Sequence, residues 1–362
     1  MFKENLSYWG LFVGIGIIFN PTLAQEKKLD PAGYINKYNT SFNGIGPKVY
    51  VLPAPRSEEE RLTDTYNELK EFNDAIYKAL YIQRFVENYK FTTNENMVEN
   101  IIKEKNDKES LELANKYIAD KNINLAYSLQ NNIARKYFMQ QSLDSTLTLL
   151  NHAFKNAQLT NNKSDILNIQ SNIASLLFLN RQFVKAGNLE EDYYKYVVAE
   201  KNNTDQANSL VKIALIQAYD KDFKSAENGI IRKAIPLFNK AKDYTGKVNA
   251  WIALAEIYRL QNKHTEAQWF LIQARDLTIE KNVANKAALI EYLLGSSKLI
   301  QENYKISEKE LSNALNLAIA EENKYLEIAI IEQLGRVNVN LKDYKEADKF
   351  LKRYWQLRKE LF

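Results

Sequence analysis

Residues 251–274 read WIALAEIYRLQNKHTEAQWFLIQA, two apolar-faced segments on either side of the polar turn Gln261-Asn262-Lys263. The first segment carries, at helical spacing, Trp251, Leu254, Ala255 and Tyr258, and the second carries Ala267, Leu271 and Ala274. Two helix axes approach to about 8–10 Å only where small side chains meet, so Ala255 and Ala267 mark the expected contact. The stretch therefore predicts two antiparallel helices packed against each other.

This helix pair repeats along the chain with a nearly constant period. The small residue recurs as Ala134, Ala174, Ala214, Ala255, Gly295 and Gly335, at spacings of 40, 40, 41, 40 and 40 residues. Nine residues after each stand Leu143, Phe183, Phe223, His264, Tyr304 and Tyr344, and three further on stand Thr146, Ala186, Ala226, Ala267, Ser307 and Ala347. One pair cannot bury its apolar face alone, so the repetition predicts a stack of pairs.

The stretch 251–274 resembles the tetratricopeptide repeat, whose W-x2-L-G/A-x2-Y and A-x3-F/L-x2-A pattern it matches at every marked position. The resemblance covers residues 122–362 as six repeats, with the departures Thr146, Ser307, Gln217, Lys298 and Asn338. The period exceeds the usual length of about 34 residues and is similar to that of kinesin light chains and of bacterial sensor and regulator proteins. The resemblance implies an all-α fold, a right-handed superhelical α-solenoid of antiparallel helix pairs, and an interaction protein.

The first residues look like a targeting segment. Lys3 is followed by a 12-residue apolar run from Tyr8 to Phe19 and by the small-residue site Thr22-Leu23-Ala24, which predicts a signal peptide over residues 1–24. The run is shorter than the roughly 20 residues of a membrane helix, although an uncleaved anchor is an alternative. We therefore expect an exported protein, periplasmic or secreted, with no membrane span in the mature chain.

Composition divides the rest of the amino-terminal region. Residues 25–56 contain four of the six prolines and are expected to form a Pro/Gly-containing linker. Ser57 and Glu60 form a capping-box pattern that starts a helix running to about Tyr89. Residues 57–121 match the repeat poorly, and we expect them to form a divergent helical cap of the kind that ends a solenoid.

Composition also argues against catalysis. The chain has no cysteine and two histidines, His152 and His264, which lie in different repeats, so the usual metal and redox ligands are missing. No phosphate-binding loop or nucleophile motif occurs. The net charge is +4 without a basic stripe interleaved with aromatic residues, which argues against nucleic-acid binding. The sequence predicts no enzyme, no cofactor and no metal.

In the resembling family, the first helix of each repeat lines a concave groove. Carried over position by position, the candidate groove residues are Asn132, Asn168, Asn172, Asn208, Lys212, Asn249 and Tyr292. A carboxamide both donates and accepts, so a ladder of asparagines could pair with the backbone of an extended peptide whatever its side chains. The alternative is that asparagine is frequent here and falls on exposed faces. A carboxylate clamp fits poorly, since only Asn172 and Lys212 match it.

The last helix, Tyr344 to Phe362, carries more apolar surface than one partner helix can cover. Trp355 and Phe362 are therefore candidates for docking on a partner or on a second copy in a homodimer. Alternatively, these side chains fold back and the nearby basic residues solvate the rest.

Two functions stay open on the sequence. The first is an extracytoplasmic scaffold that binds a protein or peptide through its concave groove. The second is the ligand-sensing component of a bacterial envelope signalling system, lacking an output domain of its own. The identity of the partner does not follow from the residues.

Overall fold

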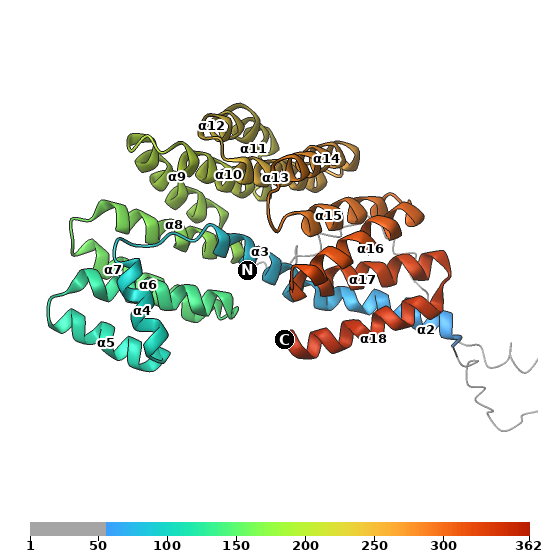
Figure 1. The fold of residues 1–362 in the computed structure, drawn as a ribbon, viewed down its shortest axis with the longest axis horizontal. Coiled ribbons are helices and arrows are strands. Elements are labelled where there is room, and N and C mark those ends of the chain that lie inside the picture. The colour runs from blue at the N-terminus through green and yellow to red at the C-terminus, as the bar shows by residue number, and fades with distance from the viewer. Residues whose placement is uncertain (1–55) are drawn as a thin grey trace, which may run out of the picture.

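The computed structural model describes residues 56–362, and every regular element in this range is a helix. The helices follow one another around an open arc (Figure 1). The predicted signal peptide and all of the predicted linker except Arg56 lie outside the described residues. Within residues 56–362, no helix combines the length and the apolar character that crossing a bilayer requires. The fold is the all-α solenoid that the repeat pattern predicts.

The body of the arc consists of antiparallel helix pairs in chain order. They are α6 (Ile123–Met139) with α7 (Leu143–Gln158), α8 (Lys163–Leu179) with α9 (Phe183–Ala199), α10 (Asn203–Tyr219) with α11 (Phe223–Asn228), η3 (Gly229–Ala234) and α12 (Ile235–Ala241), α13 (Tyr244–Leu260) with α14 (His264–Lys281), α15 (Ala287–Ile300) with α16 (Tyr304–Ala320), and α17 (Lys324–Leu341) with α18 (Tyr344–Leu361).

Small residues hold the paired helices close together. Ala134, Ala174, Ala214 and Ala255 are fully buried. At Gly295 an added Cβ would lie 2.6 Å from the Cγ of Leu311 on the paired helix α16, closer than any real contact. The recurring small residue therefore marks the helix contact, as the sequence pattern predicts.

Many of the turns between helices contain a residue in the left-handed conformation that is not glycine. Positive φ angles follow the helix C-caps at Gln141, Arg181, Lys201, Lys221, Asn262, Glu302 and Glu322. After Gln141, the backbone N–H of Ser142 donates to the carbonyl of Tyr137 at 3.0 Å, as in a Schellman motif. These turns return the chain antiparallel to the preceding helix.

One repeat is a residue longer than the others, and a π turn accommodates the extra residue. The spacing from Ala214 to Ala255 is 41 residues, and the second helix of this repeat contains the π-helical turn η3 between α11 and α12. A π turn adds one residue to a helix without breaking it. Pro236 at the start of α12 lacks an N–H donor, which fits this change in hydrogen bonding.

Residues 58–119 divide into two parts that pack against different faces of the solenoid. Residues 58–87 form α2 (Glu58–Glu68), the 3₁₀ turn η2 (Leu69–Phe72) and α3 (Asn73–Glu87), so the helix predicted to run to Tyr89 is interrupted. The predicted capping box at Ser57 and Glu60 is present. Residues 95–119 form α4 (Glu95–Glu104) and α5 (Asp107–Ala119), and α5 packs against α6. Only this second part extends the stack at its amino-terminal end.

Residues 58–87 lie along the inside of the arc. The sequence predicted instead that they form part of a cap at the end of the solenoid. Figure 1 shows α2 and α3 running along the concave side of the helix pairs. Buried residues lie around the whole circumference of α3, among them Ile76, Tyr77, Ala79, Ile82 and Phe85. A helix that is buried on all sides is surrounded by protein. The sequence pattern of α3 predicts instead a helix with one buried face.

Candidate functional site

Residues 58–87, which form α2, η2 and α3, lie along the inner face of the solenoid. We call them the amino-terminal segment. α3 contacts α6, α8 and α17, and α2 contacts α17 and α18. At the far end, Tyr66 donates to the carbonyl of Ala347 at 2.7 Å, and its ring occupies the space left by the missing side chain of Gly335. Lys286 and Glu87 form an ion pair at 2.6 Å. The concave face is therefore lined by the first helices, as the family resemblance implies, but it is occupied.

A buried carboxylate fixes α3 in the middle of the arc. Glu256 of α13 accepts hydrogen bonds from Tyr81 of α3 and, at 3.0 Å, from Tyr219 of α10. Arg84 of α3 forms an ion pair with the same carboxylate at 2.8 Å. Removing one partner of a buried ion pair is costly, so this cluster ties α3 to two repeats at once. Burial, followed by the charge of Glu256, raises the pKa of both tyrosines, which keeps them protonated hydrogen-bond donors.

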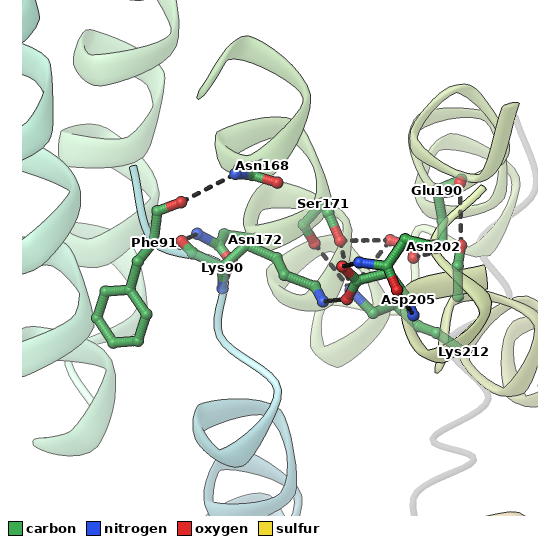
Figure 2. A network of polar contacts seen from close by, with 10 residues as sticks. Lys90, Phe91, Asn168, Ser171, Asn172, Glu190, Asn202, Asp205 and Lys212 are labelled. Atoms are coloured by element: carbon green, nitrogen blue, oxygen red, sulfur yellow. Dashed lines mark hydrogen bonds and ion pairs between the residues drawn. The ribbon is translucent and has the colours of Figure 1, made fainter. Parts of the chain in front are cut away.

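Between α3 and α4 the chain leaves the helical conformation, with turns at Asn88 and at Thr93-Asn94, and asparagine side chains of the first helices bind its backbone. We call residues 88–94 the groove segment. Asn172 accepts from Lys90 N at 2.9 Å and donates to Lys90 O at 2.8 Å, and Asn131 donates to the same carbonyl at 3.2 Å. Asn168 donates to Phe91 O at 2.9 Å, as Figure 2 shows. These side chains come from α6 and α8, in neighbouring repeats.

Two aspartates bind the groove segment on either side of the asparagines. Asp165 accepts from the backbone N–H and the hydroxyl of Thr93, both at 2.9 Å. Asp205 forms an ion pair with the ammonium of Lys90 at 2.5 Å, and that ammonium lies 5.4 Å from the ring centroid of Tyr193. The backbone contacts do not depend on the sequence of the segment, whereas the Lys90 contact does.

Lys212 makes its ion pair and hydrogen bonds within a buried polar cluster beside the groove segment. Its ammonium lies 3.0 Å from Glu190 and donates to the hydroxyl of Ser171 at 2.8 Å (Figure 2). Glu190 also accepts from Ser171 and Ser209, each at 2.8 Å. Burial lowers the pKa of Lys212 and the charge of Glu190 opposes this. Ser171 is fully buried, so its hydroxyl is not positioned to meet a substrate.

Asn208 and Asn249 occupy the same repeat position as Asn168 and lie where α3 ends and the groove segment begins, beside Phe85 and Lys90. Both line a cavity of about 40 Å³ together with Arg84 and Asn88. A volume of this size is large enough for water, since one water needs roughly 10–15 Å³ of probe-occupied space. Of the three asparagines at this position, only Asn168 binds peptide backbone in this structure.

The last two candidate groove residues, Asn132 and Tyr292, have other partners. The amide of Asn132 lies 3.5 Å from the carbonyl of Ser128 on its own helix. Tyr292 is buried and accepts from Gln333 at 3.1 Å. Burial raises the pKa of Tyr292 to about 12, and a hydrogen bond with Tyr77 of α3 works against that rise. Tyr292 therefore lies against Tyr77 of α3 and Gln333 of α17.

At the carboxyl-terminal end, the two docking candidates are partly exposed and partly covered by the amino-terminal segment. Trp355 is 42% exposed and packs edge-on against Phe72 of η2 at 5.8 Å between ring centroids. Phe362 is 47% exposed and lies 6.0 Å from the ring of Tyr325. The guanidinium of Arg358 stacks over both Phe72 and Phe362. The amino-terminal segment thus covers part of the face that α18 alone would leave in water.

Sequence reasoning did not propose Asp165, Asp205 or Glu256 as site residues, although a signal for the two aspartates exists. Each stands three residues after an asparagine that caps its helix, Asn162 or Asn202, and the pattern recurs after 40 residues. The cap orients the carboxylate, because Asn202 donates to Asp205 at 2.6 Å and leaves its other oxygen for Lys90. Within residues 56–362 no group of three potential metal-ligating side chains gathers.

Comparison with known proteins gives similarity of fold only. No protein-family model matches the sequence, and no curated protein matches it. A solved Rap protein complexed with competence and sporulation factor is 13% identical, with a TM-score of 0.52, over 84% of this chain and 99% of that chain. Aspartyl phosphate phosphatase F from Bacillus subtilis is 12% identical, with a TM-score of 0.50, over 86% and 96%.

A third similar structure is a signal transduction ATPase with a tetratricopeptide repeat sensor from Pyrococcus horikoshii. It is 16% identical, with a TM-score of 0.54, and the match covers 75% of this chain but 41% of that one. The repeat register, the buried small residues and these similarities agree. The chain has the fold of a tetratricopeptide-repeat-like protein, with its amino-terminal segment laid along the inner face.

Proposed function

We propose that this protein is an extracytoplasmic scaffold that binds a protein or peptide through the inner face of its repeats, without catalysing a reaction. The supporting observation is the pairing of Asn172 with both backbone groups of Lys90. Side-chain amides that bind backbone in this way accept an extended chain of almost any sequence. The placement outside the cytoplasm rests on the signal-peptide pattern of residues 1–24.

The second candidate, a ligand-sensing component of an envelope signalling system, has its own support. Two of the similar structures are, by their names, a Rap protein complexed with a factor and a protein with a tetratricopeptide repeat sensor. Those roles belong to proteins less than a fifth identical to this one, so they serve here only to suggest the class. A membrane-bound signalling protein encoded next to this chain would favour the sensor over the passive scaffold.

Site-specific photo-crosslinking in cells tests the use of the inner face. A crosslinking amino acid at Asn249, which lines the inner cavity, is expected to capture a partner. The matched control at Lys309, an exposed residue of the second helix α16, is expected to capture none. Capture from Lys309 and not from Asn249 would contradict binding through the inner face.

A further inference from the structure

The site that holds the groove segment binds a side chain of the segment as well as its backbone. The Lys90 ammonium lies between the Asp205 carboxylate at 2.5 Å and the face of the Tyr193 ring at 5.4 Å. Tyr193 is buried, and Asp205 is held in place by Asn202 at 2.6 Å. A fixed carboxylate beside an aromatic face is a binding site for a cation.

The next residue is also recognised. The ring of Phe91 lies under the guanidinium of Arg135 at 5.3 Å, and it packs edge-on against Tyr89 at 5.8 Å. Tyr89 in turn donates to the carbonyl of Asn131 at 2.7 Å. The site therefore accommodates a lysine with an aromatic residue on each side, in a stretch of chain that belongs to no helix.

From this geometry we infer that residues 88–94 occupy a peptide-binding site in cis, and that the external ligand is an extended peptide with a lysine flanked by aromatic residues. The inference rests on the proposed function and adds the class of ligand to it. The external peptide takes the place of the groove segment, with its lysine between Asp205 and Tyr193 and its backbone on Asn131, Asn168 and Asn172.

The covalent attachment of the groove segment to α3 and α4 decides how strongly an external peptide can compete with it for the site. A short segment joined at both ends is present at its site at an effective concentration in the millimolar range. An external peptide that makes the same contacts therefore binds the unmodified protein weakly. Weakening the cis contact while leaving the site intact must strengthen its binding.

A charge-reversal series tests this. The probe is a labelled synthetic peptide with the sequence of residues 86–96, VENYKFTTNEN, titrated by fluorescence anisotropy against the mature chain. In Lys90→Glu the cis segment is repelled by Asp205, and the peptide is expected to bind about tenfold or more tightly than to wild type, the factor that a loss of about 1.4 kcal/mol represents. Adding Asp205→Lys restores a cis ion pair of reversed sign and also repels the lysine of the probe, so binding is expected to fall to the wild-type level or below it.

Two controls define the specificity. A peptide with glutamate in place of its lysine is expected to bind Lys90→Glu at least tenfold more weakly than the lysine peptide does. Lys324→Glu breaks an ion pair between α17 and α18, with Glu360 at 2.9 Å, and leaves peptide binding as in wild type. Failure of the folded Lys90→Glu variant to bind the peptide overturns the inference, as does equal binding of the two peptides.

Hydrogen exchange on the wild type provides a result even where Lys90→Glu fails to fold. The amides of Lys90 and Thr93 bond to side chains, at 2.9 Å in both cases, and they are expected to exchange faster than the amides of buried Ile82 and Phe85 in α3. Equal protection of both sets means that the segment leaves only on global unfolding, which overturns the inference. Partner capture from Asn249 without peptide binding would refute this ligand class and leave the proposed function standing.

Discussion

Asn172 holds Lys90 by both of its backbone polar groups, accepting from the N–H at 2.9 Å and donating to the carbonyl at 2.8 Å. The two residues lie 82 positions apart in the chain. Of the asparagines proposed to bind an external peptide, Asn168 and Asn172 bind a segment of the same chain. Asn132 instead faces its own helix, and Asn208 and Asn249 line a cavity.

Replacing Asn172 should cost stability. In Asn172→Ala the N–H of Lys90 loses its partner, and an unsatisfied buried polar group costs about 1–3 kcal/mol. Urea denaturation measures the change. Asn313→Ala is the matched control, because Asn313 is exposed on the second helix α16, and its effect should stay within about 0.5 kcal/mol. Equal effects of the two substitutions would contradict the role of Asn172.

Gly335 and Tyr66 form a steric pair that a double-mutant cycle can detect. A Cβ at Gly335 would lie 1.8 Å from the hydroxyl of Tyr66, so Gly335→Ala should destabilise the fold by about 1–3 kcal/mol. In a Tyr66→Ala background the same change should cost less, since the clash is gone. Gly187→Ala is the control, because its Cβ would meet Ile216 at 3.7 Å and should stabilise the helix by about 0.5–1 kcal/mol. Additive effects of the Gly335 and Tyr66 changes would argue against the packing of α2 on α17.

Stability should fall steeply at alkaline pH. Burial raises the pKa of Tyr66, Tyr89, Tyr193, Tyr219 and Tyr292 in the folded state. The unfolded chain ionises these groups near pH 10 while the folded chain keeps them protonated, so their stabilising contribution is complete below about pH 10 and is lost as pH rises through the folded-state values. Between its unfolded-state and folded-state pKa, each tyrosine lowers the free energy of unfolding by about 1.4 kcal/mol per pH unit. Urea denaturation at pH 8 to 11 measures this, and a flat profile would contradict the burial of these tyrosines.

The amino-terminal prediction is tested by mass spectrometry of the protein recovered from its native cell. Removal of residues 1–24 should leave a chain that starts at Gln25. In Ala24→Lys the small residue required before the cleavage site is lost, and the chain should keep its first residues. A full-length wild-type protein in the cytoplasmic fraction would refute the export prediction.

The carboxyl-terminal docking prediction remains a proposal for a homodimer or a partner. The exposed fractions of Trp355 and Phe362 leave an apolar surface at this end of the arc. Light scattering on the mature protein and on Trp355→Glu with Phe362→Glu measures self-association. A dimer that becomes monomeric in the double variant would support the homodimer, and a monomer in both would remove it.

The repeat architecture was predictable because its determinants are local and periodic. Small residues such as Ala255 and Gly295 recur at one helix position, and the structure buries them at the helix contacts. Even the single 41-residue spacing has a structural counterpart, since the π turn η3 lies in the repeat that is one residue longer. Helix pairing depends on neighbours within about 40 residues, which the sequence displays directly.

The occupant of the groove was not predictable in the same way. The contacts of Tyr66 with Ala347 and of Tyr81 with Glu256 join residues 281 and 175 positions apart, and no periodicity links them. The sequence of α3 looks like one more amphipathic helix, and its burial on all sides depends on the curvature of the whole arc. The positions of Asn168 and Asn172 could be read from the repeat, whereas the role of Asn131 and the chain that these residues bind could not.

Zero-length carbodiimide crosslinking of the mature protein, with mass spectrometry of the monomer fraction, tests the position of the groove segment most directly. A covalent link is expected between Lys90 and Asp205, whose side chains are 18% and 28% exposed and in contact, and a second link between Lys286 and Glu87. The exposed pair Lys324 and Glu360, at 2.9 Å, controls for the reaction itself. Formation of the control link without either groove link in the monomer would contradict the account.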